Sequence, residues 1–173
     1  MLTLVTGGSK CGKSSYAEKI LDDFPGEKLY IATMIPYGDE AAAAIMRHHK
    51  MREGKGFSTI ECVRELETRF IPDGCGVLLE CIGNLCANEM FTPDGIRNPV
   101  SPILRGISHL CDHAAQVVAV TNEVGEDGIT YSPETMDYIR YIAEINAAIA
   151  DRADTVIECV AGIPLVVKGE KPC

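Results

Sequence analysis

Five short runs of Val, Ile and Leu recur along the chain, and none shows the polar alternation of a half-exposed strand. Strands that are buried on both faces of a parallel sheet have this pattern. We therefore predict strands over residues 2–6, 29–32, 77–80, 117–121 and 155–160.

Longer stretches between these runs predict helices over residues 13–22, 39–51, 62–70, 82–91, 103–113 and 133–152. The last helix carries the clearest signals. Ser132 can accept hydrogen bonds from the free N–H groups of the first turn, Pro133 fits the first helical position, and Glu134 suits the positive end of the dipole. Isoleucines then follow at steps of three and four residues: Ile139, Ile142, Ile145 and Ile149.

The alternation of strands and helices predicts an α/β fold, a mainly parallel sheet with helices on both faces. A final apolar run at residues 165–167 predicts a short antiparallel edge strand at the C-terminus. Residues 92–102 hold three prolines and a glycine, so we expect a surface loop there. A chain of 173 residues suits one domain with a sizeable core, and we expect a single nucleotide-binding domain over residues 1–173.

The first strand leads into a glycine-rich motif, Gly7-Gly8-Ser9-Lys10-Cys11-Gly12-Lys13-Ser14, which fits the phosphate-loop pattern G-x-x-x-x-G-K-[ST]. Glycines let the backbone bend closely around phosphate oxygens, and the following helix adds its positive end. We expect Lys13 to act on the β- and γ-phosphates and Ser14 to bind Mg²⁺. Because the motif stands between a predicted strand and a predicted helix, it indicates a nucleoside triphosphate site.

The predicted strand over residues 77–80 ends in a carboxylate, Glu80. In nucleotide-binding sheets, an acid at this place often orients the magnesium ion or a water molecule. A strand end that meets solvent explains the residue equally well from sequence alone. Ser14 and Glu80 are the candidate metal ligands.

The net charge of −9 changes the expected set of partners. An acidic surface repels phosphate backbones, so we expect no nucleic-acid partner.

One segment is basic, with His48 and His49 among Arg47, Lys50 and Arg52. Adjacent helical residues point about 100° apart, so one histidine can face a cleft while its neighbour faces solvent. Sequence alone leaves open whether this segment is a solvated helix face or carries a nucleophilic histidine beside a polyphosphate.

The eight cysteines include no Cys-x-x-Cys pair, and several lie in or next to apolar segments. Free cysteine in such places behaves as a small hydrophobe, so we expect reduced thiols and a cytoplasmic location. No apolar run approaches the roughly 20 residues that span a bilayer, so we expect no membrane span.

In this order, the motifs resemble the bifunctional adenosylcobinamide kinase/adenosylcobinamide-phosphate guanylyltransferase family of cobalamin biosynthesis. The resemblance extends over nearly the whole chain. It rests on residues 4–14, 29–33, 59–62, 78–81 and 120–125, on Asp39-Glu40 followed by the histidine pair, and on Arg140, Asn146 and Gly162-Ile163.

The resemblance implies a RecA-like phosphate-loop fold and a homotrimer with active sites between subunits. It implies phosphorylation of the aminopropanol hydroxyl of adenosylcobinamide, with ATP or GTP as donor. GMP transfer from GTP through a covalent GMP–histidine would then yield adenosyl-GDP-cobinamide. Beyond the phosphate loop, the implied nucleotide-site residues are Ala32, Thr33, Met34, Lys50, Arg52, Glu61 and Glu80.

The implied catalytic histidine has two candidate positions. Counting forward from Thr33 places it at His48, and counting back from Glu61 places it at His49. Insertions and deletions are tolerated better in the loop after the histidine pair than in the predicted helix that carries the pair, so we favour His48.

The chain departs from the family pattern in three places. Ser9-Lys10-Cys11 stands where Ala-Arg-Ser is usual, residues 125–128 replace Gly-Met-Gly, and Tyr141 replaces an aspartate. Two other functions fit the residues: a single-function small-molecule kinase on the same fold, and a nucleotide-responsive regulator without turnover.

Overall fold

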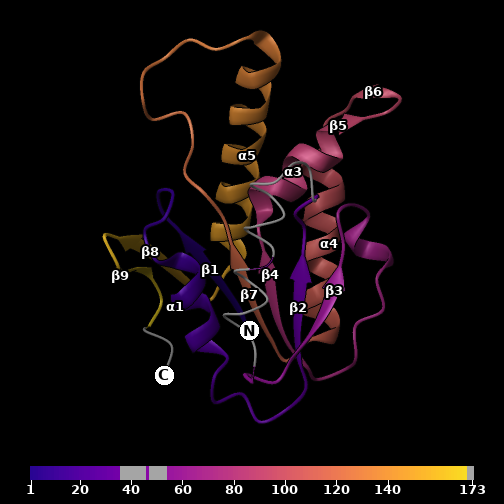
Figure 1. Cartoon of the computed structure of the whole chain (residues 1–173), viewed down its shortest axis with the longest axis vertical. Helices are drawn as coiled ribbons and strands as arrows, with labels where there is room; N and C mark the ends of the chain where they lie inside the picture. Colours follow the sequence, from indigo (N-terminus) through magenta and orange to yellow (C-terminus); the bar gives the residue numbers. More distant parts are fainter. Residues whose placement is uncertain (36–45, 47–53, 171–173) are drawn as a thin grey trace.

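The structure is a computed structural model that describes residues 1–35, 46 and 54–170. Seven strands form one sheet in the order β3-β2-β4-β7-β1-β8-β9 (Figure 1). Their bounds are β1 (Leu2–Thr6), β2 (Lys28–Ala32), β3 (Phe57–Glu61), β4 (Gly76–Glu80), β7 (Gln116–Val120), β8 (Thr155–Val160) and β9 (Ile163–Lys168). All neighbouring strands are parallel except β8 and β9, which confirms the mainly parallel sheet and its antiparallel C-terminal edge.

Helices cover both faces of this sheet, as predicted. One core joins the sheet to α3 (Ile82–Met90), α4 (Val100–His113) and α5 (Pro133–Arg152). A second core, on the opposite face, joins it to α1 (Lys13–Ile20). Because side chains alternate along a strand, Leu79 of β4 lies in the first core and its neighbour Leu78 lies in the second.

The helix α5 begins as its capping signals predict. The Ser132 hydroxyl accepts a hydrogen bond from the Thr135 N–H at 3.4 Å, and Pro133 occupies the first turn. Ile145 and Ile149 are fully buried, whereas Ile139 is only half-buried. The first turns of α5 project past the sheet, beside the loop that leads into the helix (Figure 1, orange).

The structure differs from the sequence prediction in two ways around β3. The edge strand β3 was not predicted, and the helix predicted over residues 62–70 is only a short 3-10 helix, η1 (Leu66–Thr68). Glu65 adopts a left-handed backbone, with φ 54°, immediately before η1. Its N–H donates to Glu89 Oε1 at 2.6 Å, and Arg64 Nε donates to Asn88 O at 2.6 Å. Contacts with α3 therefore override the local helical preference.

The prediction of a loop over residues 92–102 is also incomplete. A small hairpin pairs β5 (Phe91–Thr92) with β6 (Gly95–Ile96), and α4 begins at Val100. Pro102 lies in the first turn of α4, where N–H groups need no partner within the helix. The helix predicted over residues 39–51 lies outside the described residues except for Met46, which is helical.

The seven cysteines within the described residues are all free, as predicted. Four cysteines were expected in or next to apolar segments: Cys62 and Cys159 are buried, whereas Cys81 and Cys111 are half-buried. Cys86 is also buried. Burial raises the pKa of Cys86 to about 12. Among the described helices, none is long and apolar enough to cross a membrane.

Candidate functional site

The predicted phosphate loop lies between the end of β1 at Thr6 and the start of α1 at Lys13. Gly7 has φ 133° and Gly12 has φ 94°, values that side chains disfavour. A Cβ on Gly7 would lie 2.4 Å from the Cys159 carbonyl oxygen, so glycine lets the loop approach β8. The N–H of Gly162 donates to Cys11 O at 2.9 Å. The turn between β8 and β9 therefore supports the loop from one side.

The side chain of Lys13 is held within the loop. Only 6% of the residue is exposed, and its Nζ donates to Gly7 O at 2.8 Å and to Gly8 O at 2.5 Å. The first turn of α1 holds no acidic residue, and no side chain caps its N-terminus. The Lys13 ammonium and the backbone amides at the start of α1 therefore both lie at the phosphate loop. This arrangement suits an anion.

Ser14 and Glu80, the two predicted metal ligands, are in direct contact. The Ser14 hydroxyl donates a hydrogen bond to Glu80 Oε1, and Tyr30 Oη donates to Glu80 Oε2 at 3.1 Å. The strand β7 separates β1 from β4, but α1 packs against all three strands and carries Ser14 across. The topology therefore brings the carboxylate of one strand to the loop that follows another.

The end of β2 is tied to the end of β4. Thr33 is fully buried; its hydroxyl donates to Cys81 O at 2.9 Å and accepts from the Cys81 N–H at 2.7 Å. Asn88 Nδ2 donates to Thr33 O at 2.8 Å. These bonds fix the carboxyl edge of the sheet, and the nucleotide contact expected of Thr33 stays a prediction. Met34, the next residue, is half-buried.

Three predicted site residues lie in register at the ends of neighbouring strands: Glu61 on β3, Ala32 on β2 and Glu80 on β4. Ala32 is in register with Glu80 on one side and with Glu61 on the other. Glu61 is exposed at the end of the edge strand β3. Four strand spacings separate β3 from β1, which is roughly 19 Å, so Glu61 lies far from the phosphate loop.

A polar network lies at the end of β7, among residues to which the sequence motifs assigned no individual role. Thr6 Oγ1 donates to Glu123 Oε1 at 3.0 Å, and the Glu123 N–H donates to Gly7 O at 3.4 Å. The buried Thr121 hydroxyl donates to Asn146 Oδ1 on α5 at 2.7 Å. Their position in the sequence could have indicated a site, because these residues follow the carboxyl end of a predicted central strand.

The predicted residues His48, His49, Lys50 and Arg52 lie outside the described residues, and their roles stay predictions. The first described basic residue that follows them along the chain is Lys55, whose Nζ lies 2.6 Å from Glu18 Oε2. Glu18 is fully buried on α1. This ion pair ties the chain that precedes β3 to the helix that follows the phosphate loop.

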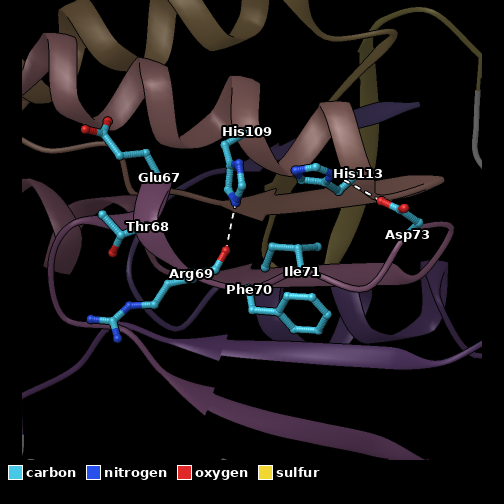
Figure 2. A pocket seen from close by; sticks show the side chains of 8 residues that line it. All are labelled: Glu67, Thr68, Arg69, Phe70, Ile71, Asp73, His109 and His113. Atoms are coloured by element: carbon cyan, nitrogen blue, oxygen red, sulfur yellow. Dashed lines mark hydrogen bonds and ion pairs between the residues drawn. The ribbon is translucent and has the colours of Figure 1, made fainter.

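A separate pocket of about 450 Å³ lies beside η1 and α4 (Figure 2). His109 Nε2 is 2.8 Å from Arg69 O, and His113 Nδ1 is 3.1 Å from Asp73 Oδ1. Because His113 ends α4 and Asp73 precedes β4, the pocket lies at the amino ends of the strands, opposite the phosphate loop. Its lining residues are Glu67, Thr68, Arg69, Phe70, Ile71, Asp73, His109 and His113. It contains none of the predicted site residues.

The family model described as cobinamide kinase / cobinamide phosphate guanyltransferase matches residues 3–167. The chain belongs to this family. It is therefore a nucleotide-dependent transferase, and the resemblance noted from the motifs is confirmed. The chain is 36% identical to the bifunctional adenosylcobalamin biosynthesis protein CobU of Salmonella typhimurium, over 97% of this chain and 100% of that protein. It is 33% identical to CobU of Escherichia coli, with the same shares of the two chains covered.

Solved structures share the fold at low sequence identity. An ATPase of a bacterial type III secretion system superposes with a TM-score of 0.51 at 10% identity, over 91% of this chain and 50% of that chain. This similarity agrees with the mainly parallel α/β sheet and the phosphate loop of this chain. The similarity concerns the fold alone.

Proposed function

We propose that this family member phosphorylates the aminopropanol hydroxyl of adenosylcobinamide and then transfers GMP from GTP to the new phosphate. The observation that carries the proposal is the convergence of Lys13, Ser14 and Glu80 at one phosphate loop. Both steps act on phosphorus, and both need a site that stabilises negative charge as it develops.

The kinase step is proposed to occur at the phosphate loop. Backbone amides of the loop and the start of α1 bind the phosphates of ATP or GTP, and Lys13 leaves its carbonyl partners to bind the β- and γ-phosphates. The oxygens of Ser14 and Glu80 fit Mg²⁺, which is usually held by one or two carboxylates together with substrate phosphates. When bound, the ion neutralises charge on the phosphate oxygens.

The transfer step is proposed to use His48, with His49 as the other candidate. A neutral imidazole nitrogen forms a bond to the α-phosphorus of GTP, the bond to the leaving oxygen breaks, and pyrophosphate departs. The cobinamide phosphate oxygen then displaces the histidine and takes the GMP. Lys50 and Arg52 would hold the triphosphate, and Glu61 would accept hydrogen bonds from the guanine edge. Since β3 and β1 are roughly 19 Å apart, the two steps present the nucleotide differently.

We further propose a homotrimer with active sites between subunits, located in the cytoplasm. The edge strand β9 supports association, because Ile163, Leu165 and Val167 expose apolar side chains along it. Free cysteines throughout the described residues support a reducing compartment.

Product analysis tests the proposal. With adenosylcobinamide, Mg²⁺ and ATP alone, the protein should add one phosphate to the substrate. Addition of GTP should then yield adenosyl-GDP-cobinamide and one pyrophosphate. Phosphorylation without GMP addition would leave only the single-function kinase, and nucleotide binding without turnover would leave the regulator.

A further inference from the structure

We propose that Glu123 is the general base of the kinase step, the group that accepts the proton of the attacking hydroxyl. The inference rests on the kinase half of the proposed function and adds a catalytic residue to it. Phosphoryl transfer to an alcohol needs a group that orients the hydroxyl and takes its proton.

The position of Glu123 carries the inference. It follows the carboxyl end of β7, which is hydrogen-bonded to β1, the strand that leads into the phosphate loop. The Glu123 N–H donates to Gly7 O at 3.4 Å, and Lys13 Nζ donates to the same oxygen at 2.8 Å. The backbone of Glu123 and the lysine ammonium therefore meet at one atom, next to the place where the γ-phosphate is proposed to lie.

Three other carboxylates need comparison: Glu80 is committed, Glu61 is distant, and Glu158 on β8 is the register partner of Thr6 and serves as the control below. Both oxygens of Glu80 already accept hydrogen bonds, from Ser14 and from Tyr30. Glu61 lies on the edge strand, four strands from β1. The Thr6 hydroxyl donates a hydrogen bond to Glu123 Oε1 at 3.0 Å. This bond orients the carboxylate and leaves Oε2 to accept a hydrogen bond from a substrate hydroxyl. The side chain is half-buried, so it is shielded and still reachable.

A rigid support holds Glu123 in place. Thr121, which is fully buried, donates to Asn146 Oδ1 on α5 at 2.7 Å, and Asn146 Nδ2 donates to Asn122 O at 3.3 Å. Gly125 follows in a left-handed turn with φ 84°, where a Cβ would lie 2.6 Å from Ile139 Cγ2. The chain on both sides of Glu123 is thus fixed to α5, as catalytic geometry requires.

The proposed step balances in atoms and charge. The substrate oxygen forms a bond to the γ-phosphorus, and the bond from that phosphorus to the β–γ bridging oxygen breaks. The nucleoside diphosphate leaves with the electron pair. The hydroxyl proton moves to Glu123 Oε2, from which it passes to water before the next turnover.

The test compares Glu123→Gln with a matched control, Glu158→Gln. Glutamine keeps the shape of Glu123 and an oxygen that can accept the Thr6 hydroxyl, so the fold should survive. Glu158 is a half-buried glutamate on β8, the other neighbour of β1, and is the register partner of Thr6. Steady-state kinase rates would be measured with adenosylcobinamide, Mg²⁺ and either ATP or GTP.

We expect Glu123→Gln to lower kcat of phosphorylation by at least about 100-fold, the usual contribution of a general base. The KM values for nucleotide and Mg²⁺ should stay near those of the unmodified protein, because the replaced carboxylate is proposed to take the substrate proton and to bind neither of them. Thr6→Val, which removes only the orienting bond, should lower kcat less. Guanylyl transfer to preformed adenosylcobinamide phosphate should persist in Glu123→Gln.

Several results would overturn the assignment: near-normal kcat in Glu123→Gln, an equal loss in Glu158→Gln, or a raised KM for Mg²⁺, which would make Glu123 a metal ligand. Equal loss of both activities would indicate a merely structural role. An unmodified protein that phosphorylates nothing would instead refute the proposed function, so the two failures are distinguishable.

Discussion

The substitution Gly7→Ala tests how closely the phosphate loop must approach the sheet. Gly7 has φ 133°, and a Cβ there would lie 2.4 Å from Cys159 O and 3.0 Å from Cys11 Sγ. The nearest obstacle is backbone carbonyl, which a rotamer change cannot remove. Either the loop or the end of β8 must move.

The expected cost follows from these contacts. A side chain at a disfavoured backbone conformation costs about 1–3 kcal/mol, and forced overpacking costs about 1–3 kcal/mol more. Alanine regains about 0.4–1 kcal/mol by restricting the unfolded chain. The net loss is about 1–6 kcal/mol, against the 5–15 kcal/mol typical of a folded protein.

Urea unfolding measures this loss, with Gly8→Ala as the control. A Cβ on Gly8 has no heavy atom within 4 Å apart from its chain neighbours, so that variant should unfold near the midpoint of the unmodified protein. With a urea slope of about 2 kcal/mol per M, Gly7→Ala should unfold at a midpoint lower by about 0.5–3 M, with an unchanged slope. If both variants unfolded at the same midpoint, the close approach of the loop to Cys159 would not stabilise the fold.

Three further predictions concern single side chains. Lys13→Ala should abolish phosphoryl transfer without unfolding the protein, because the ammonium acts on charge in the transition state; near-normal kinase rates would exclude that role. Glu80→Gln should weaken the Mg²⁺ dependence of turnover, whereas Glu61→Gln should change the preference for GTP over ATP in the transferase step; unchanged dependence in both would remove these roles. Burial raises the pKa of Cys86 to about 12, so folding favours the protonated thiol. The unfolding free energy should therefore fall between about pH 9 and pH 12, by at most about 1.4 kcal/mol per pH unit, and Cys86→Ala should flatten that slope.

The sequence predicted the central strands and the phosphate loop because their signals are local. β1 is buried on both faces, and its apolar run leads directly into the glycines that the turn requires. The C-terminal edge strand was also predicted, although β9 (Ile163–Lys168) extends beyond the predicted residues 165–167.

The features that sequence could not supply depend on contacts between distant residues. β3 carries Ser58, Thr59 and Glu61, and as an edge strand it lacks the continuous apolar run of a buried one. The helix predicted over residues 62–70 does not form because this segment instead donates hydrogen bonds to α3.

The site residues also divide into those that a local motif reveals and those that only contacts between distant residues bring together. Lys13 and Ser14 are recognisable from the motif, but the contact of Ser14 with Glu80 depends on α1 crossing β7. The pairing of Thr6 with Glu123 spans 117 positions, and only the strand order brings the two together.

The most direct test of the guanylyltransferase assignment is covalent labelling with α-labelled GTP, followed by mapping of the label by mass spectrometry. We predict an acid-labile, base-stable GMP adduct on His48. It should be lost in His48→Ala and retained at least in part in His49→Ala, because adjacent positions on the predicted helix point about 100° apart and we expect only one of them to face the nucleotide. Label on His49 would contradict the choice of His48. A protein that binds GTP yet carries no label on either histidine would contradict the guanylyltransferase assignment itself.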